Sequence, residues 1–200
     1  MLGVLTSGPS VTPFRYWQKG HLYHHEHVGD RGSDDGSRTI LFTVEEYNAF
    51  PLHEKIFWRI IRDPIFFFIV VPFYQFMIQY RAKRVNEWHS HFPTLWLIVY
   101  YSFLYRVDPT LCVLDFLGTW LGAIFGFLLF HLQHEVNSAY WKEHHEYNSK
   151  DSSLLGCTLL LVPECLKWAT LGIEYHHIHH LSTKVPGYNL RAVIIHFFKK

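Results

Sequence analysis

Long apolar stretches alternate with polar, histidine-bearing segments along this chain. Residues 64–80 carry no charge, but they number only 17 and hold Pro72 near the middle, so a straight helix across a bilayer would be short and kinked. We therefore expect a re-entrant or interfacial helix within residues 61–84. Residues 154–171 are also apolar, but Pro163 interrupts them, which favours a helix at a membrane surface or two short helices.

A second apolar region has the pattern of a transmembrane hairpin. Residues 92–107 are apolar and aromatic, a turn follows at Asp108, and residues 111–130 form a run of 20 whose only charge is Asp115. The pattern predicts an all-α integral membrane protein with a transmembrane hairpin over residues 92–131.

Basic residues ahead of this hairpin predict its orientation. Arg81, Lys83 and Arg84 precede the first apolar helix, and the positive-inside tendency places such a group in the cytoplasm. A hairpin that leaves the cytoplasmic face must return to it, so His131 is expected on the same side as the other polar histidine segments.

Histidine is the chemically distinctive residue, with 16 copies, many of them in three dense clusters. The clusters are HLYHH with His21, His24 and His25, HLQH with His131 and His134, and HHIHH with His176, His179 and His180. The first and third share the pattern HxxHH, and on an α-helix positions i, i+3 and i+4 lie on one face, so three rings point into one volume. Eight imidazoles exceed the needs of one ion but suit two, which predicts a dimetal site of zinc, iron, copper or nickel. Residues 21–50 and 131–190 would form a polar cap that holds this site.

The other histidines and the nearby acids receive supporting roles. His177 lies beside the third cluster and is a reserve ligand, while Glu26, Asp30 and Glu135 are placed to orient ligand N–H groups. No catalytic residue beyond the metal ligands is expected. The remaining histidines are interpreted as surface or supporting residues: His27, His53, His89, His91, His144, His145 and His196.

Composition narrows the function classes. Aromatic residues make up 18% of the chain, as much as all charged residues together, which favours lipid contact. The net charge of +1 and the dispersed Lys and Arg residues exclude a nucleic-acid partner. Cys112, Cys157 and Cys165 are odd in number and lack CxxC spacing, so no disulfide framework is expected.

Four segments in order, HLYHHEHVGD, TVEEY, FHLQHEVNSAYW and EYHHIHHLSTKVPGYNL, resemble the membrane fatty-acid desaturases, particularly the acyl-lipid Δ12-type branch. The resemblance implies two iron ions, dioxygen as co-substrate, and introduction of a cis double bond into a fatty acyl chain. It also implies which residues bind iron: His21, His24, His25, His134, His176, His179 and His180, with His131 a ligand or a neighbour of one.

The same resemblance implies the partners and the location. The substrate would be an acyl lipid, acyl-CoA or acyl-carrier thioester, and electrons would come from a separate donor, ferredoxin or cytochrome b5. The acyl tail would lie in an apolar tunnel, for which Phe and Trp residues of segments 92–130 are candidates. The protein would be integral to a membrane, with the metal site facing the cytoplasm, or the stroma in a plastid.

One departure from the family pattern changes these expectations. The family's first histidine pair, which resembles HDCGH and follows two transmembrane helices, has no counterpart here, so residues 1–200 are expected to form a desaturase-like domain that is incomplete at its N-terminus. The alternatives are therefore a catalytically inactive remnant or regulatory partner, and an acyl hydroxylase or acetylenase of the same family. A histidine-rich metal transporter is disfavoured because the histidines flank the apolar spans.

Overall fold

The computed structural model describes residues 2–33, 41–82, 90–134 and 140–198, and these are almost entirely helical. The predicted all-α class is confirmed for the described residues, where the only β-type pairing is an isolated bridge between Asp30 and Lys142. The α-helices are α1 (Leu2–Thr6), α2 (Phe14–His27), α3 (Val44–Ala49), α4 (Leu52–Ile61), α5 (Val71–Phe73), α6 (Tyr80–Ala82), α7 (Phe92–Val107), α8 (Pro109–His134), α9 (Ser149–Leu155), α10 (Lys167–Thr170), α11 (His176–Leu181) and α12 (Leu190–Phe198). Short π-helical and 3₁₀ turns accompany them: η1 (Phe66–Val70), η2 (Tyr74–Gln79), η4 (His144–Glu146), η5 (Glu164–Leu166), η6 (Ile173–Tyr175) and η7 (Gly187–Asn189).

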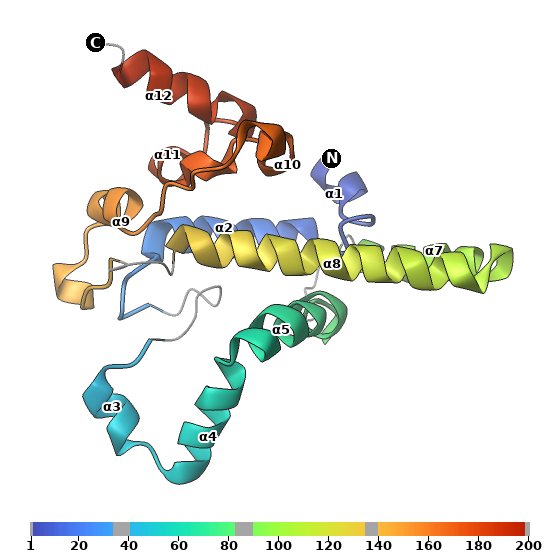
Figure 1. The fold of residues 1–200 in the computed structure, drawn as a ribbon, viewed down its shortest axis with the longest axis horizontal. Helices are drawn as coiled ribbons and strands as arrows, with labels where there is room; N and C mark the ends of the chain where they lie inside the picture. Colours follow the sequence, from blue (N-terminus) through green and yellow to red (C-terminus); the bar gives the residue numbers. More distant parts are fainter. Residues whose placement is uncertain (1, 34–40, 83–89, 135–139, 199–200) are drawn as a thin grey trace. The chain divides into compact units, whose positions relative to one another are not determined.

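The chain forms two compact units. Unit 1 consists of Met1–Lys19 and Thr39–Leu128, and unit 2 consists of Gly20–Arg38 and Leu129–Lys200. Helices α2 and α8 each begin in unit 1 and end in unit 2. Figure 1 shows α8 as a single unbroken helix, with α9 to α12 following it in chain order. All three histidine clusters therefore belong to unit 2.

The uncharged stretch of unit 1 folds into η1, α5, η2 and α6 in succession. Pro72 lies in α5, between the two π-helical turns, and has no N–H with which to continue an α-helical ladder. At the start of this stretch, the Asp63 carboxylate accepts hydrogen bonds from the backbone N–H groups of Ile65 (3.0 Å) and Phe66 (3.1 Å). A helix interrupted at Pro72 is the result, and its re-entrant or interfacial position stays a prediction.

Helices α7 and α8 fold back on each other around Asp108. The hydroxyls of Tyr100 and Tyr101 in α7 donate to the Asp115 carboxylate in α8 at 3.1 and 3.0 Å, so the one acid of the apolar run is hydrogen-bonded within the hairpin. Asp108 also accepts from the backbone N–H of Thr110 at 2.7 Å, which caps the first turn of α8.

Only one helix of this hairpin is long enough to span a membrane by itself. Among the described residues, α8 is the single candidate span, with 26 residues and a mean hydropathy of 1.9 in its most apolar window. Helix α7 has 16 residues, which at 1.5 Å per residue extends about 24 Å and falls short of a hydrocarbon core of about 30 Å. The expected transmembrane hairpin is thus not confirmed.

Apolar side chains lie mostly outside the fold rather than within it. Apart from prolines, the buried apolar side chains among the described residues are Val11, Val28 and Leu190, while none of the most apolar window of α8 is buried. A water-soluble domain of this size would bury a contiguous apolar core. The buried interior of unit 2 is instead largely polar and is dominated by histidine.

Candidate metal centre

Helix α2 supplies the first histidine cluster from one face. His24 and His25 are buried and His21 is partly buried, while Leu22 and Tyr23 between them point outward and are exposed. The helix ends in a turn at Gly29, whose φ of +82° lies in the left-handed region. A Cβ there would come within 2.4 Å of the Tyr140 carbonyl oxygen, so only glycine allows this close approach.

The end of α8 supplies His134, and neighbouring backbone groups fix its orientation. Its Nδ1 lies 3.2 Å from the Gly156 carbonyl oxygen. Because a carbonyl oxygen only accepts, Nδ1 carries the proton and the lone pair of Nε2 faces the cluster. The adjacent Gln133 donates from Nε2 to the Ile173 carbonyl oxygen at 3.3 Å, which ties the end of α8 to the segment before the third cluster.

Helix α11 supplies the third cluster after a tight turn. Gly172 has a φ of +88°, and a Cβ at this position would meet the Gly187 carbonyl oxygen at 2.3 Å. Beyond it, the buried Glu174 carboxylate accepts a hydrogen bond from the Thr170 hydroxyl at 2.7 Å. The backbone carbonyl oxygen of Glu174 accepts another from the Leu160 N–H at 3.2 Å. These bonds set the position at which α11 begins.

The three helices bring seven histidines into two groups. One group is His24, His134, His176 and His180, all buried, and the other is His21, His25 and His179. In each group the candidate ligand nitrogens lie within 4.8 Å of one another.

The Nε2 atoms within each group face each other directly. In the first group the Nε2 of His134 is 3.1 Å from that of His24 and 2.8 Å from that of His176, which is in turn 3.1 Å from that of His180. In the second group the Nε2 of His21 is 3.1 Å from that of His25 and 3.3 Å from that of His179.

These separations match ligands on a common ion. Two nitrogens each about 2.1 Å from one ion are about 3.0 Å apart at a right angle and about 3.4 Å apart at the tetrahedral angle. Two facing lone pairs repel each other unless a proton carried by one of the nitrogens, or a cation, lies between them. The residues present therefore fit a cation at each group.

The two groups adjoin each other. The ring of His25 in the second group stacks on that of His180 in the first, with centroids 4.0 Å apart, and it meets His179 edge-on at 4.5 Å. His21 and His24 also stack, at 5.9 Å. Two ions held by these groups would be close neighbours.

Burial keeps the histidines neutral. Burial first, and then repulsion from the neighbouring rings, lowers the pKa of His25 to about 2 and that of His21 to about 4. The pKa values of His176 and His180 are lowered by the same two causes in the same order. Neutral imidazole is the form that binds metal, so the electrostatics of the cluster favour a metal over a proton.

The donor set consists of nitrogen alone. Cys157 places its Sγ 3.9 Å from His134, but beside Nδ1 and so on the far side of that ring from the cluster. Burial raises the pKa of its thiol to about 12, which keeps the sulfur protonated and unsuited to bind a metal.

A clamp of polar contacts holds the end of α2 against residues 140–152. Asp30 is fully buried, and its carboxylate accepts from His144 Nδ1 and from the Gly32 N–H, each at 2.9 Å. Burial alone would raise the pKa of Asp30, but these hydrogen bonds lower it overall. The Ser152 hydroxyl donates to the Val28 carbonyl oxygen beside it. The clamp fixes the end of the helix that carries the first cluster.

The structure groups seven of the eight predicted ligands. His131 lies one turn before His134 on α8 and is outside both groups, and the reserve ligand His177 is also outside them. Asp30 accepts from His144 rather than from a clustered ring, which corrects its expected role, and Glu26 is exposed. Glu135 lies outside the described residues.

Several supporting residues were not identified from the sequence. Gln133, Gly156 and Ser152 act through contacts between segments far apart in the chain, whereas the Glu174 carboxylate accepts from Thr170 four residues earlier. Only Gln133 had a local signal, because it stands between two histidines in HLQH.

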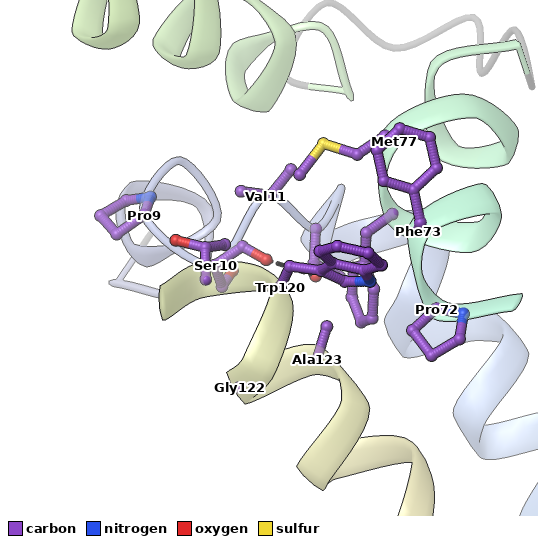
Figure 2. Close-up of a pocket in the computed structure, with 12 residues that line it drawn as sticks. Pro9, Ser10, Val11, Pro72, Phe73, Met77, Trp120, Gly122 and Ala123 are labelled. Atoms are coloured by element: carbon purple, nitrogen blue, oxygen red, sulfur yellow. Dashed lines mark hydrogen bonds between the residues drawn. The ribbon is translucent and has the colours of Figure 1, made fainter. Parts of the chain in front are cut away.

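Unit 1 contains an apolar cavity of about 410 Å³. Figure 2 shows Trp120 of α8 facing Phe73 and Met77 of the uncharged stretch, with the turn Pro9–Val11 on another side. Trp120 belongs to segments 92–130, where aromatic tunnel residues were expected, whereas Phe73 and Met77 come from outside them.

Comparisons with known proteins agree on one family. Residues 1–194 match the sequence model of the fatty acid desaturase family. The chain is 29% identical over 214 residues to a fatty acid desaturase of Bacillus subtilis (strain 168), which covers 98% of this chain and 58% of that protein. It is 23% identical to an sn-1 oleoyl-lipid 12-desaturase of Synechocystis (96% and 56% covered) and 25% identical to a chloroplastic omega-6 fatty acid desaturase of Arabidopsis thaliana (96% and 44% covered).

The chain thus spans about half the length of these curated relatives. No solved structure matches it.

The clamp at Asp30 gives a first prediction. Replacing Asp30 by Ala removes the acceptor of two hydrogen bonds from a fully buried position, which should cost about 1–3 kcal/mol of stability. Thermal unfolding of the purified protein in detergent, followed by tryptophan fluorescence, measures the loss. His145→Ala, an exposed neighbour, is the control and should shift stability by less than about 0.5 kcal/mol. Equal stability of the two variants would contradict the clamp.

The lowered pKa values predict how stability depends on pH. In the unfolded chain histidine titrates near 6.5, whereas in the fold burial holds the pKa of His21 at about 4 and that of His25 at about 2. The unfolded state therefore takes up protons first as pH falls, so stability is full above pH 6.5 and is lost below it.

Thermal melts of chelator-treated protein over this pH range check the sign. The double variant His21→Gln, His25→Gln should show a shallower pH dependence. A wild-type protein that gains stability on acidification would rule out neutral, buried rings.

Proposed function

Because the chain belongs to the fatty acid desaturase family, a family of membrane-associated oxidoreductases, we propose that it holds two iron ions and contributes to the oxygen-dependent introduction of a cis double bond into a fatty acyl chain. The observation that carries the proposal is the convergence of seven histidine Nε2 atoms into two adjoining groups. The family supplies the reaction and the choice of iron, since nitrogen ligands alone would also suit zinc, copper or nickel.

The proposed reaction balances as a four-electron reduction of dioxygen. Two adjacent methylene groups of the acyl chain lose two hydrogen atoms and gain a double bond. Dioxygen accepts these two hydrogens together with two electrons and two protons from outside, and two molecules of water are formed. The iron ions, when bound, supply the activation of dioxygen. The two outside electrons require a separate donor, for which we propose ferredoxin or cytochrome b5.

The proposed role of the protein is to hold and shield the ions. His24, His134, His176 and His180 would bind one ion, and His21, His25 and His179 the other. The first set is buried, which would shield an ion there from water, while the second includes partly buried rings and would leave an ion there more accessible. His131, one helical turn from His134, stays a candidate that could complete a ligand set.

A hydrogen-bond acceptor behind a ring orients its Nε2 toward the cluster. The Gly156 carbonyl oxygen fixes the tautomer of His134, as carbonyls behind metal-bound histidines commonly do. The described structure also leaves three buried Nδ1 atoms without a hydrogen-bond partner: those of His25, His176 and His180. Water or polar groups of the substrate could supply hydrogen-bond partners for these three Nδ1 atoms.

The apolar parts of the chain fit a membrane-embedded acyl substrate. We propose that the cavity beside Trp120 and Phe73 receives part of an acyl chain, supplied as an acyl lipid, acyl-CoA or acyl-carrier thioester. We also propose that α7 and α8 insert into the membrane as a hairpin, with the metal centre on the cytoplasmic side, or the stromal side in a plastid. The basic residue Arg81, in the last turn of α6, supports that orientation.

Metal content tests the site. The purified chain reconstituted with ferrous iron should bind about two iron ions, and His179→Ala, from the second group, or His134→Ala, from the first, should each lower this to about one. Elemental analysis of the desalted protein gives the count. His53→Ala, an exposed histidine of α4, is the matched control and should leave it unchanged. Equal iron content in all three variants would contradict two separate groups.

Product analysis tests the reaction. The chain is expressed in a host that lacks the corresponding double bonds, together with an electron donor, and fatty acids are measured by gas chromatography. A new unsaturated fatty acid that disappears in His176→Ala but persists in His145→Ala supports the proposal. A hydroxylated or acetylenic product would instead assign the chain to another reaction of the family. Full metal binding without any product would indicate an inactive relative.

A further inference from the structure

Helix α4 turns its apolar side outward. Leu52, Ile56, Phe57 and Ile60 are 73%, 48%, 53% and 50% exposed, and on a helical wheel they share one arc. Such an arc normally faces the protein core, because burial of apolar side chains drives folding in water. Its exposure in α4 indicates that the helix has an apolar neighbour outside the described fold.

One edge and the back of α4 make the contacts with the protein. Lys55 donates from Nζ to the Asn48 carbonyl oxygen at 2.8 Å, and Arg59 donates from Nε to the Tyr47 hydroxyl at 3.0 Å. Between them, the half-buried Trp58 meets the ring of Phe42 with centroids 4.9 Å apart. These contacts hold α4 in its orientation, so a rotation that would bury the apolar arc must break them.

The exposed apolar surface does not stop at the end of α4. Ile65, at 72% exposure, continues it into the uncharged residues 64–80, where Ile69, Val70 and Phe73 are also exposed. A protein partner usually meets an apolar patch closed by a polar rim. An apolar surface that continues into an uncharged stretch, with Lys55 and Arg59 along one edge, is instead typical of a helix on a membrane.

The direction of α4 agrees with this neighbour. Figure 1 shows that, within unit 1, α4 runs across the direction of α8, the candidate membrane span. A helix that crosses the direction of a spanning helix lies along the membrane plane rather than through it.

We propose that α4 is a membrane-surface helix, with Leu52, Ile56, Phe57 and Ile60 inserted among lipid acyl chains and Lys55 and Arg59 at the level of the headgroups. The long stems of the two basic side chains reach from the apolar edge to the phosphates, as lysine and arginine do at membrane boundaries. His53 shares the apolar arc, and its polar ring keeps the helix at the boundary rather than deep in the hydrocarbon.

Site-directed spin labelling of the whole chain in lipid nanodiscs tests the proposal. Cys112, Cys157 and Cys165 are first replaced by Ser, and nitroxides are then attached to Ile56→Cys or Ile60→Cys, with Glu54→Cys from outside the apolar arc as the matched control. Collision with oxygen, which concentrates in lipid, is compared with collision with a water-soluble nickel chelate. At Ile56 and Ile60 we expect oxygen collisions to exceed nickel collisions several-fold, and the reverse at Glu54.

Each other result overturns the proposal. High nickel accessibility at Ile56 and Ile60 would place the arc in water, and low accessibility to both reagents would mean that a protein surface covers it. A second measurement needs no substitution: lipids with a photoreactive group in the acyl chain should label the peptide of residues 52–61 in the unaltered chain. Labelling of α8 without labelling of this peptide would also refute a membrane-surface helix. Neither measurement depends on metal binding or activity.

Discussion

The convergence of imidazole nitrogens is the constraint on which unit 2 depends. Nε2 atoms 2.8 to 3.3 Å apart need a proton carried by one of the two nitrogens, or a cation, between them, because two facing lone pairs repel each other. A second proton, which would charge a ring, is disfavoured because burial and the neighbouring rings lower the pKa of His25 to about 2. A metal ion would satisfy all the converging lone pairs of a group at once and would stabilise the meeting of α2, α8 and α11, which has little apolar contact. Val28 and Leu190 are the buried apolar side chains of unit 2 among the described residues, so metal binding and folding should be coupled there.

The sequence predicted this site as far as local geometry determines it. The spacing HxxHH fixes which rings share a helix face, so helical periodicity alone was enough to assign His21, His24 and His25 to one volume. Spacing alone did not separate His131 from His134, because both lie on the same side of α8. The resemblance favoured His134, which α2 and α11 bring into a group. Asp30 was placed near the site but given the wrong partner, since His144 lies 114 residues away and approaches only through the turn at Gly29.

The membrane segments were predictable in composition but not in length or depth. The absence of charge identified residues 64–80 as an apolar segment, and Pro72 indicated that a straight α-helix would be interrupted there. The π-helical turns on both sides of Pro72 had no signal in the local sequence pattern. Helix α7 is mostly apolar and aromatic, with Arg106 in its last turn. It ends at Val107, where the Asp108 turn begins, and 16 residues do not cross a bilayer unaided. The outward apolar arc of α4 was missed because its amphipathic pattern reads equally well as a helix on a soluble core.

The two units are therefore expected to be stabilised by different ligands. Unit 1 exposes apolar side chains along α4 and α8, so lipid that removes them from water should stabilise it. Unit 2 buries histidine rings, so metal ions that bind their lone pairs should stabilise it. Ligands that bind only the folded state raise stability with their concentration, so lipid and metal act as separate stabilising ligands of one chain. A substitution of a clustered histidine should change the metal-dependent part of the stability, and a substitution in α4 the lipid-dependent part. Helices α2 and α8, which contribute residues to both units, are where the two dependences can become coupled.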